Sequence, residues 1–195
     1  MKYLLIGLLS IASCVSVEAQ VQVGVKAGAN FSSLTGSDVR GASTRVGFQG
    51  GLLAAVPLGN SFWLQPEVNF SMQGAQAEAG GSVYTIHNNY LNVPLLVKYK
   101  DESGLFAETG PQFGVLLSAK ASANGGTVDV KSSYKSTDIS WAFGLGYLVK
   151  QINAGIDVRY NLGITNIESN ASASNGTTRN SVFQVGVFYL FGNGK

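Results

Sequence analysis

The sequence predicts an all-β protein, an eight-stranded antiparallel up-and-down transmembrane β-barrel. Eight segments of roughly 12 residues alternate apolar and polar side chains, as strands between lipid and a polar interior do. An N-terminal segment of the export type precedes them. The connections alternate long and short, which is typical of outer-membrane barrels with tight periplasmic turns and longer external loops.

The composition fits a single membrane-embedded domain. Of the 195 residues, 45% are hydrophobic and 12% are charged, about half the roughly 25% that soluble domains carry. The 25 glycines fall largely inside the alternating segments. A formal net charge of +2 is too small to indicate nucleic-acid binding.

Residues 1–19 are predicted to be a signal peptide and residues 20–195 the barrel domain. Lys2 provides the charged start, and residues 4–17 are apolar but too few for a spanning helix. The small-x-small pattern of Val17-Glu18-Ala19 marks the cleavage site.

Cys14 leaves an alternative open at this end. Ile11-Ala12-Ser13-Cys14 resembles a loose lipoprotein box, which would lipidate Cys14 instead. Since Cys14 is the only cysteine, no disulfide can form within the chain.

The first three alternating segments are 21–34, 44–58 and 62–73. The first has valines, alanines and Phe31 at odd positions, with polar residues or glycines between them. The second turns Val46 and Phe48 outward. The third is the most regular, because all its even positions are apolar and its odd positions are polar except Trp63.

The other five segments are 84–100, 105–119, 138–150, 153–167 and 181–192. Each again has one apolar face, which carries most of its Leu, Val, Ile, Phe and Tyr. Aromatic side chains near the segment ends should form two interfacial girdles; these are Phe31, Phe48, Tyr99, Trp141, Phe183 and Phe191.

The connections follow the same logic. Short turns are expected near residues 57–60, 101–104 and 150–153, and the first has Pro, Gly and Asn in turn-forming order. Longer polar loops are expected at 35–43, 76–82, 120–137 and 168–180. Pro66, Pro94 and Pro111 lie inside segments, so we expect bulges or strand ends there.

A soluble eight-stranded calyx of the lipocalin type is the alternative architecture. It would turn the apolar faces inward. The resulting surface would consist of glycines and amides, and the interior would have to hold many large aromatic rings, which favours the membrane barrel.

Several motifs resemble a known family. Tyr90-Leu91-Asn92-Val93-Pro94-Leu95-Leu96-Val97-Lys98-Tyr99 is similar to the YLxIPLLxKY strand of the Bacteroidetes outer-membrane β-barrel family, also called porin-family or PorT-like. Three other stretches match it in order, namely Gly24–Asn30, Gly110–Gly114 and Arg159–Ile164. The resemblance implies an OmpX/OmpA-like small barrel in the outer membrane of a Gram-negative bacterium, and it implies little about activity.

Six charged side chains are predicted to face the lumen, three of each sign: Lys26, Glu67, Lys98, Glu108, Asp157 and Arg159. An eight-stranded barrel is just wide enough for side chains, and buried charges must pair. We therefore expect a neutral polar plug. A narrow conduit for small solutes, or a proton-linked site, is the alternative.

No catalytic, cofactor or metal site is predicted, and we expect a protein that is not an enzyme. His87 is the only histidine, and Asn88 and Asn89 follow it where a rim hydrolase would need a nearby serine. One histidine without a second ligand also argues against a zinc site.

The expected function is therefore structural or surface-interacting. The expected partners are outer-membrane lipid, lipopolysaccharide and, during insertion, the barrel-assembly machinery. Lys120, Lys131 and Lys135 in the third long loop are candidates for contact with lipopolysaccharide phosphates. We expect a monomer.

Overall fold

The computed structural model describes residues 21–37, 39, 42–79, 82–123, 125–169 and 176–192. The predicted signal peptide, residues 1–19, lies outside the described residues together with Cys14. Within the described ranges, no helix is both long and apolar enough to cross a membrane.

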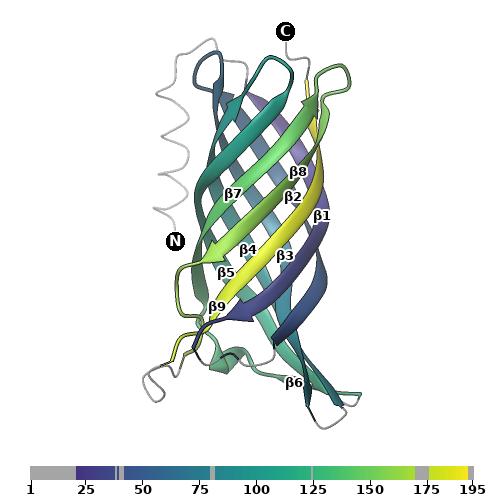
Figure 1. Ribbon diagram of the computed structural model, residues 1–195, viewed down its shortest axis with the longest axis vertical. Coiled ribbons are helices and arrows are strands. Elements are labelled where there is room, and N and C mark those ends of the chain that lie inside the picture. Colours follow the sequence, from purple (N-terminus) through teal and green to yellow (C-terminus); the bar gives the residue numbers. More distant parts are fainter. Residues whose placement is uncertain are drawn as a thin grey trace.

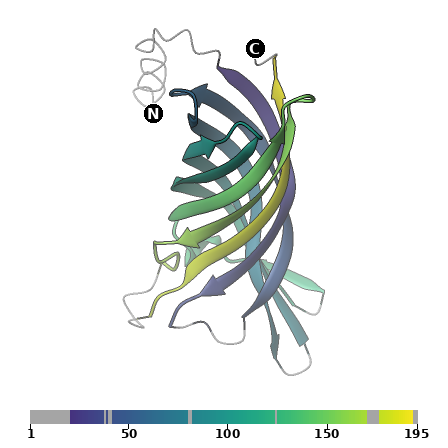
Figure 2. The ribbon, with the colours of Figure 1, turned by 45° about the horizontal axis from the view of Figure 1, so that its top comes forward.

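Eight long antiparallel strands form a closed sheet, which confirms the predicted fold class (Figure 1). Each pairs with the next long strand in sequence, and β1 pairs with β9 to close the ring (Figure 2). The strands are β1 (Gln22–Thr35), β2 (Ala42–Pro57), β3 (Phe62–Ala79), β4 (Ser82–Lys100), β5 (Leu105–Ala123), β7 (Thr137–Val149), β8 (Ala154–Gly163) and β9 (Arg179–Phe191).

Side-chain burial follows the predicted alternation. On β5, for example, buried and exposed residues alternate from Leu105 to Leu117. The large apolar side chains point outward, including all six aromatic residues of the predicted girdles. The inward face carries most of the buried amides and charges. The apolar surface is thus the outer wall, which rules out the calyx alternative.

The three short turns and the two outermost strand ends, Gln22 and Phe191, lie at one end of the barrel, the short-turn end (Figure 1). Its backbone needs left-handed residues at Gly104 (φ +101°) and Asn153 (φ 52°). Glycine and asparagine adopt that region most easily, which is why local sequence predicts these turns well.

The opposite, long-loop end differs from the prediction. The loop expected at 76–82 is wrong, because β3 and β4 stay paired as far as Ala79 and Ser82. The loop expected at 120–137 is partly structured. β5 continues to Ala123, a short strand β6 (Gly126–Asp129) pairs with it, and a 3₁₀ turn η1 (Lys131–Ser133) follows. Inter-strand pairing overrides the polar composition of these stretches.

The expectation of proline bulges is also wrong. Pro66, Pro94 and Pro111 lie inside β3, β4 and β5, each at least four residues from a strand end. Beside each proline two ladder pairs are missing toward the preceding strand, yet the register is the same on both sides of the gap. Pairing above and below each gap keeps the strand in place although proline has no N–H to donate.

Candidate functional site

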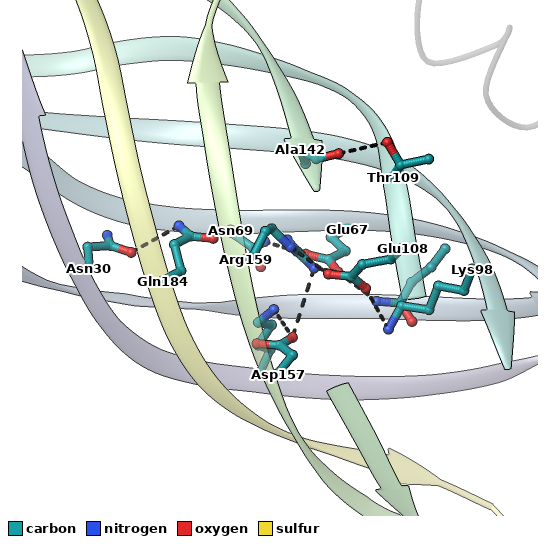
Figure 3. Close-up of polar contacts among 12 residues, drawn as sticks. Asn30, Glu67, Asn69, Lys98, Glu108, Thr109, Ala142, Asp157, Arg159 and Gln184 are labelled. Atoms are coloured by element: carbon teal, nitrogen blue, oxygen red, sulfur yellow. Dashed lines mark hydrogen bonds and ion pairs between the residues drawn. The ribbon is translucent and has the colours of Figure 1, made fainter. Parts of the chain in front are cut away.

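The lumen contains all six predicted charged residues, and the structure joins them into one network that we call the charge layer. Arg159 on β8 lies at its centre, with a fully buried side chain. Its Nη1 and Nη2 donate to the two carboxylate oxygens of Glu67 at 2.9 and 2.8 Å. Its Nε donates to Glu108 Oε1 at 2.7 Å (Figure 3). Such bidentate arginine–carboxylate pairs are among the strongest polar contacts in proteins.

Two lysines complete the charge layer. Lys98 Nζ lies 2.9 Å from Glu108 Oε2. Lys26 Nζ donates to Asp157 Oδ2, and Arg159 Nη2 lies 4.0 Å from that same oxygen. Three positive and three negative groups therefore cancel. Because buried ions are tolerated only when paired, this balance makes the layer compatible with a barrel interior.

Two inward glycines make the contacts possible. Gly144 on β7 lies between its cross-strand partners Glu108 and Arg159. A Cβ at Gly144 would stand 2.7 Å from Glu108 Oε1. Gly186 on β9 does the same for Asp157 and Lys26, since a Cβ there would lie 2.7 Å from Asp157 Oδ1 and 3.0 Å from Lys26 Cε. Each glycine lets side chains from the strands on either side meet.

Amide side chains add hydrogen bonds to the Glu67 carboxylate and to the polar interior beside it. Gln65 Nε2 and Asn69 Nδ2 donate to the two Glu67 oxygens at 2.6 and 2.7 Å, so this carboxylate accepts four hydrogen bonds. Gln184 Nε2 donates to Asn30 Oδ1 at 2.9 Å, and Asn30 Nδ2 donates to Ser71 Oγ. The polar interior is thus cross-linked from β1 to β9 (Figure 3).

Apolar side chains close the lumen at the short-turn end. Phe106 and Phe188 meet edge to face, with ring centroids 5.9 Å apart. This short-turn cluster also contains Leu53, Ala55, Leu148 and Leu190, with Trp63 packed against it. It blocks the periplasmic mouth if the barrel has the usual orientation.

A folded cap closes the long-loop end. Val130 and Tyr134 pack inward on Tyr90, Leu116 and Ala119. Tyr134 also forms a β-bridge with Glu168, which joins the third and fourth loops. Burial and the Glu168 carboxylate raise the pKa of Tyr134, so this phenol stays neutral.

In the structure β8 ends at Gly163 and β9 begins at Arg179, so the fourth loop comprises residues 164–178, and Asp138 bonds to side chains at both of its ends. Thr165 Oγ1, near the start of the loop, donates to Asp138 Oδ1 at 2.7 Å. Asn180 Nδ2, just past its end, donates to Asp138 Oδ2 at 2.9 Å. Between them the Ile167 side chain is fully buried. We call this contact set the Asp138 clamp.

Residues 16–169 match the family model of the outer membrane protein beta-barrel domain. The chain belongs to this outer-membrane β-barrel family. Comparison with curated protein sequences gives no match.

Solved outer-membrane barrels share the fold of this family member. Neisserial surface protein A (NspA) aligns over 86% of this chain and 96% of its own, with 14% identity and a TM-score of 0.54. Ail of Yersinia pestis aligns over 87% and 98%, with 15% identity and a TM-score of 0.48. OprG of Pseudomonas aeruginosa aligns over 87% and 95%, with 14% identity and a TM-score of 0.47. At 14% identity the likeness to NspA shows the fold alone.

The structure places His87, the residue considered for a rim hydrolase, on β4. His87 lies opposite Gly74 and Lys120 in the ladders. Among the described residues, no group of three or more His, Cys, Asp and Glu side chains is placed to hold a metal ion.

Sequence reasoning missed the Asp138 clamp and the cap. The inward direction of Asp138 follows from the alternation of its segment. Its partner Asn180 is 42 residues away, across a loop, so no local pattern indicates the contact. The two glycines did carry a usable signal, because inward glycines on β7 and β9 separate the strands whose charges must meet.

Proposed function

We propose that this outer-membrane protein is a plugged, non-conducting barrel with a structural or surface-interaction role, and that it is not an enzyme. The observation that carries the proposal is the charge layer. Its fully buried Arg159 spans the lumen to Glu67 on β3 and Glu108 on β5. A conducting path would have to pass through this paired and neutral layer.

Two further closures support the same function. The short-turn cluster and the loop cap lie on either side of the charge layer. An ion would have to cross an apolar barrier at one mouth and displace a hydrogen-bonded loop at the other. Dehydrating an ion at an apolar constriction is costly, so each closure alone opposes conduction.

The exposed parts at the long-loop end are then the surfaces left for a partner. Lys120 and Lys135 are exposed there, and Lys131 Nζ donates to the carbonyl of Leu117 on the outer wall. We propose that these lysines contact lipopolysaccharide phosphates. Outer-membrane lipid covers the apolar wall in this proposal. The barrel-assembly machinery inserts the chain, which remains a monomer. We also propose that a signal peptide directs the export of this protein. In this proposal the protein is PorT-like and comes from a Gram-negative bacterium of the Bacteroidetes.

The test is single-channel recording of protein purified from outer membranes, in a planar bilayer. Folding is checked beforehand by the difference in gel mobility between unboiled and boiled samples. We expect no unit conductance steps. Glu67→Gln is compared with Glu78→Gln, an exposed glutamate farther along the same strand.

Conductance steps from folded protein whose ion selectivity changes in Glu67→Gln, and not in Glu78→Gln, would overturn the plug. That result would instead establish a narrow porin-like channel for small solutes, with the charge layer as its selectivity filter. A silent bilayer with both variants supports the plug.

A further inference from the structure

A small cavity lies between the short-turn cluster and the charge layer, with which it shares Lys98. Its volume is about 30 Å³. One side is lined by Trp63, Gln65, Lys98 and Lys100, and the other by leucine, alanine and phenylalanine side chains. Because roughly 10–15 Å³ suffices for one water molecule, this cavity has room for a single small ion.

The polar side of the cavity consists almost entirely of hydrogen-bond donors. Trp63 is the cross-strand partner of Lys98, and Lys100 follows two residues later on the same face of β4. The indole Nε1–H of Trp63 is buried and has no acceptor among the described residues. Indole can donate and cannot accept, so this group requires an acceptor from outside the protein.

Within the described ranges, the lining of the cavity carries two positive side chains, Lys98 and Lys100, and no negative one. The charge layer is neutral in itself, and Lys98 is already paired with Glu108. Lys100 Nζ lies 4.0 Å above the Trp63 ring. In the described part of the chain no carboxylate oxygen comes within 4.0 Å of Lys100 Nζ. No Asp or Glu lines the cavity, so its surplus charge is positive.

We propose that this cavity binds one small monovalent anion of the halide class. Trp63 Nε1 donates a hydrogen bond to the anion, and the ammonium groups of Lys98 and Lys100 supply the attraction. The apolar wall suits monovalent halides such as chloride, bromide and iodide, because they give up their water more readily than multivalent oxyanions such as phosphate or sulfate do. A water molecule could also accept from the indole, but an anion is attracted more strongly by the two neighbouring ammonium groups.

The binding test uses Trp63 as its own reporter. The chain has two tryptophans, so Trp141→Phe leaves Trp63 as the only one. Protein purified from outer membranes is titrated with potassium iodide, which replaces potassium gluconate at constant ionic strength. We expect iodide to quench Trp63 fluorescence saturably and chloride to compete.

Two lysine variants identify the site. Lys100→Gln in the same background should weaken iodide binding about tenfold, as expected for the loss of one charge-assisted contact. Lys150→Gln is the matched control. That lysine lies at the same end, does not line the cavity and donates to the carbonyl of Glu102, so binding should change less than about twofold under salt screening.

Quenching that rises linearly with iodide, ignores chloride and is equal in all three proteins would overturn the proposal. If Lys100→Gln does not fold by the gel-mobility criterion, crystals of the unsubstituted protein soaked in bromide decide the question. An anomalous peak within the cavity supports the anion site. Bromide peaks elsewhere, with none between Trp63 and Lys100, overturn it.

Discussion

The two ends of this barrel are closed by different chemistry. At the short-turn end six buried apolar residues and Trp63 pack together, and tight turns join their strands. At the long-loop end the closure depends on polar contacts between segments far apart in the chain, above all the Asp138 clamp. Apolar packing tolerates small shifts, whereas the clamp needs specific donors at specific distances.

The difference teaches where each closure gets its stability. The short-turn cluster lies on strands held by ladders on both sides, so its loss should weaken the whole barrel. The cap is held by loops, so its loss should increase local opening of these loops before it lowers the stability of the whole barrel. Substitutions at each end, and in the charge layer between them, test whether the two closures are independent.

The largest effect should come from Arg159→Met. Removing the guanidinium leaves Glu67 and Glu108 buried without their main partner, which should cost about 3–5 kcal/mol of the free energy of unfolding. The measurement is urea unfolding of the barrel in lipid vesicles, followed by gel mobility. Arg179→Met, an exposed arginine at the start of β9, is the control. An unchanged urea midpoint for Arg159→Met would contradict a stabilising charge layer.

Phe188→Ala should be next. The change removes the edge-to-face contact with Phe106 and opens a hole in the short-turn cluster, at about 3 kcal/mol. The same urea experiment measures it. Val187→Ala, the neighbouring residue that is 58% exposed on the outer wall, should cost far less. If Phe188→Ala also accelerated cleavage within residues 164–178 as strongly as Asp138→Ala does, the two ends would not be independent.

Asp138→Ala should act mainly at the long-loop end. It leaves Thr165 Oγ1 without its acceptor and Asn180 Nδ2 with only the 3.3 Å bond to Tyr90 Oη, at about 1–3 kcal/mol. The sharper readout is limited proteolysis, in which cleavage between residues 164 and 178 should speed up before the urea midpoint falls by much. Ser140→Ala is the matched control, since it is buried two residues along β7 and bonds Gln112 instead. Equal cleavage in both variants would refute the clamp.

The smallest effect concerns the turn that contains Asp101. Its carboxylate accepts from Ser103 Oγ at 2.7 Å and from the Gly104 and Leu105 amides at 3.0 Å, and these bonds lower its pKa from 3.8. Because the pKa of Asp101 is lower in the folded protein than in the unfolded chain, its ionised carboxylate stabilises the turn at any pH above the unfolded-state pKa. This stabilisation is lost as the pH falls through the folded-state pKa. Carboxyl NMR titration should give a midpoint below 3.8, and Asp101→Asn should abolish the acid-dependent exchange of the Gly104 amide. A midpoint at or above 3.8 would contradict these contacts.

The same contrast explains what the sequence can predict. Alternation, turn residues and inward charges are local signals. The amino-acid sequence therefore predicts both the ring of eight strands and the six members of the charge layer. The long-loop end could not be predicted in this way. Gln76 and Glu78 look like loop residues, yet they pair with Thr85 and Val83 on β4. The partners of Asp138 come from across the fourth loop, and only the closed barrel brings them together.

Closure of the ring and neutralisation of the lumen are the same event. The ion pairs join residues 92 positions apart (Glu67 with Arg159) and 131 apart (Lys26 with Asp157). Lys98 and Glu108 can pair across β4 and β5 alone, but without β8 the charges of Lys26 on β1 and Glu67 on β3 lack the partners that they have in the closed barrel. A half-assembled sheet is therefore electrostatically penalised in a membrane, and only the complete one is not. We therefore expect the charge layer to favour cooperative insertion, since most of its ion pairs need β8, the strand that carries Asp157 and Arg159.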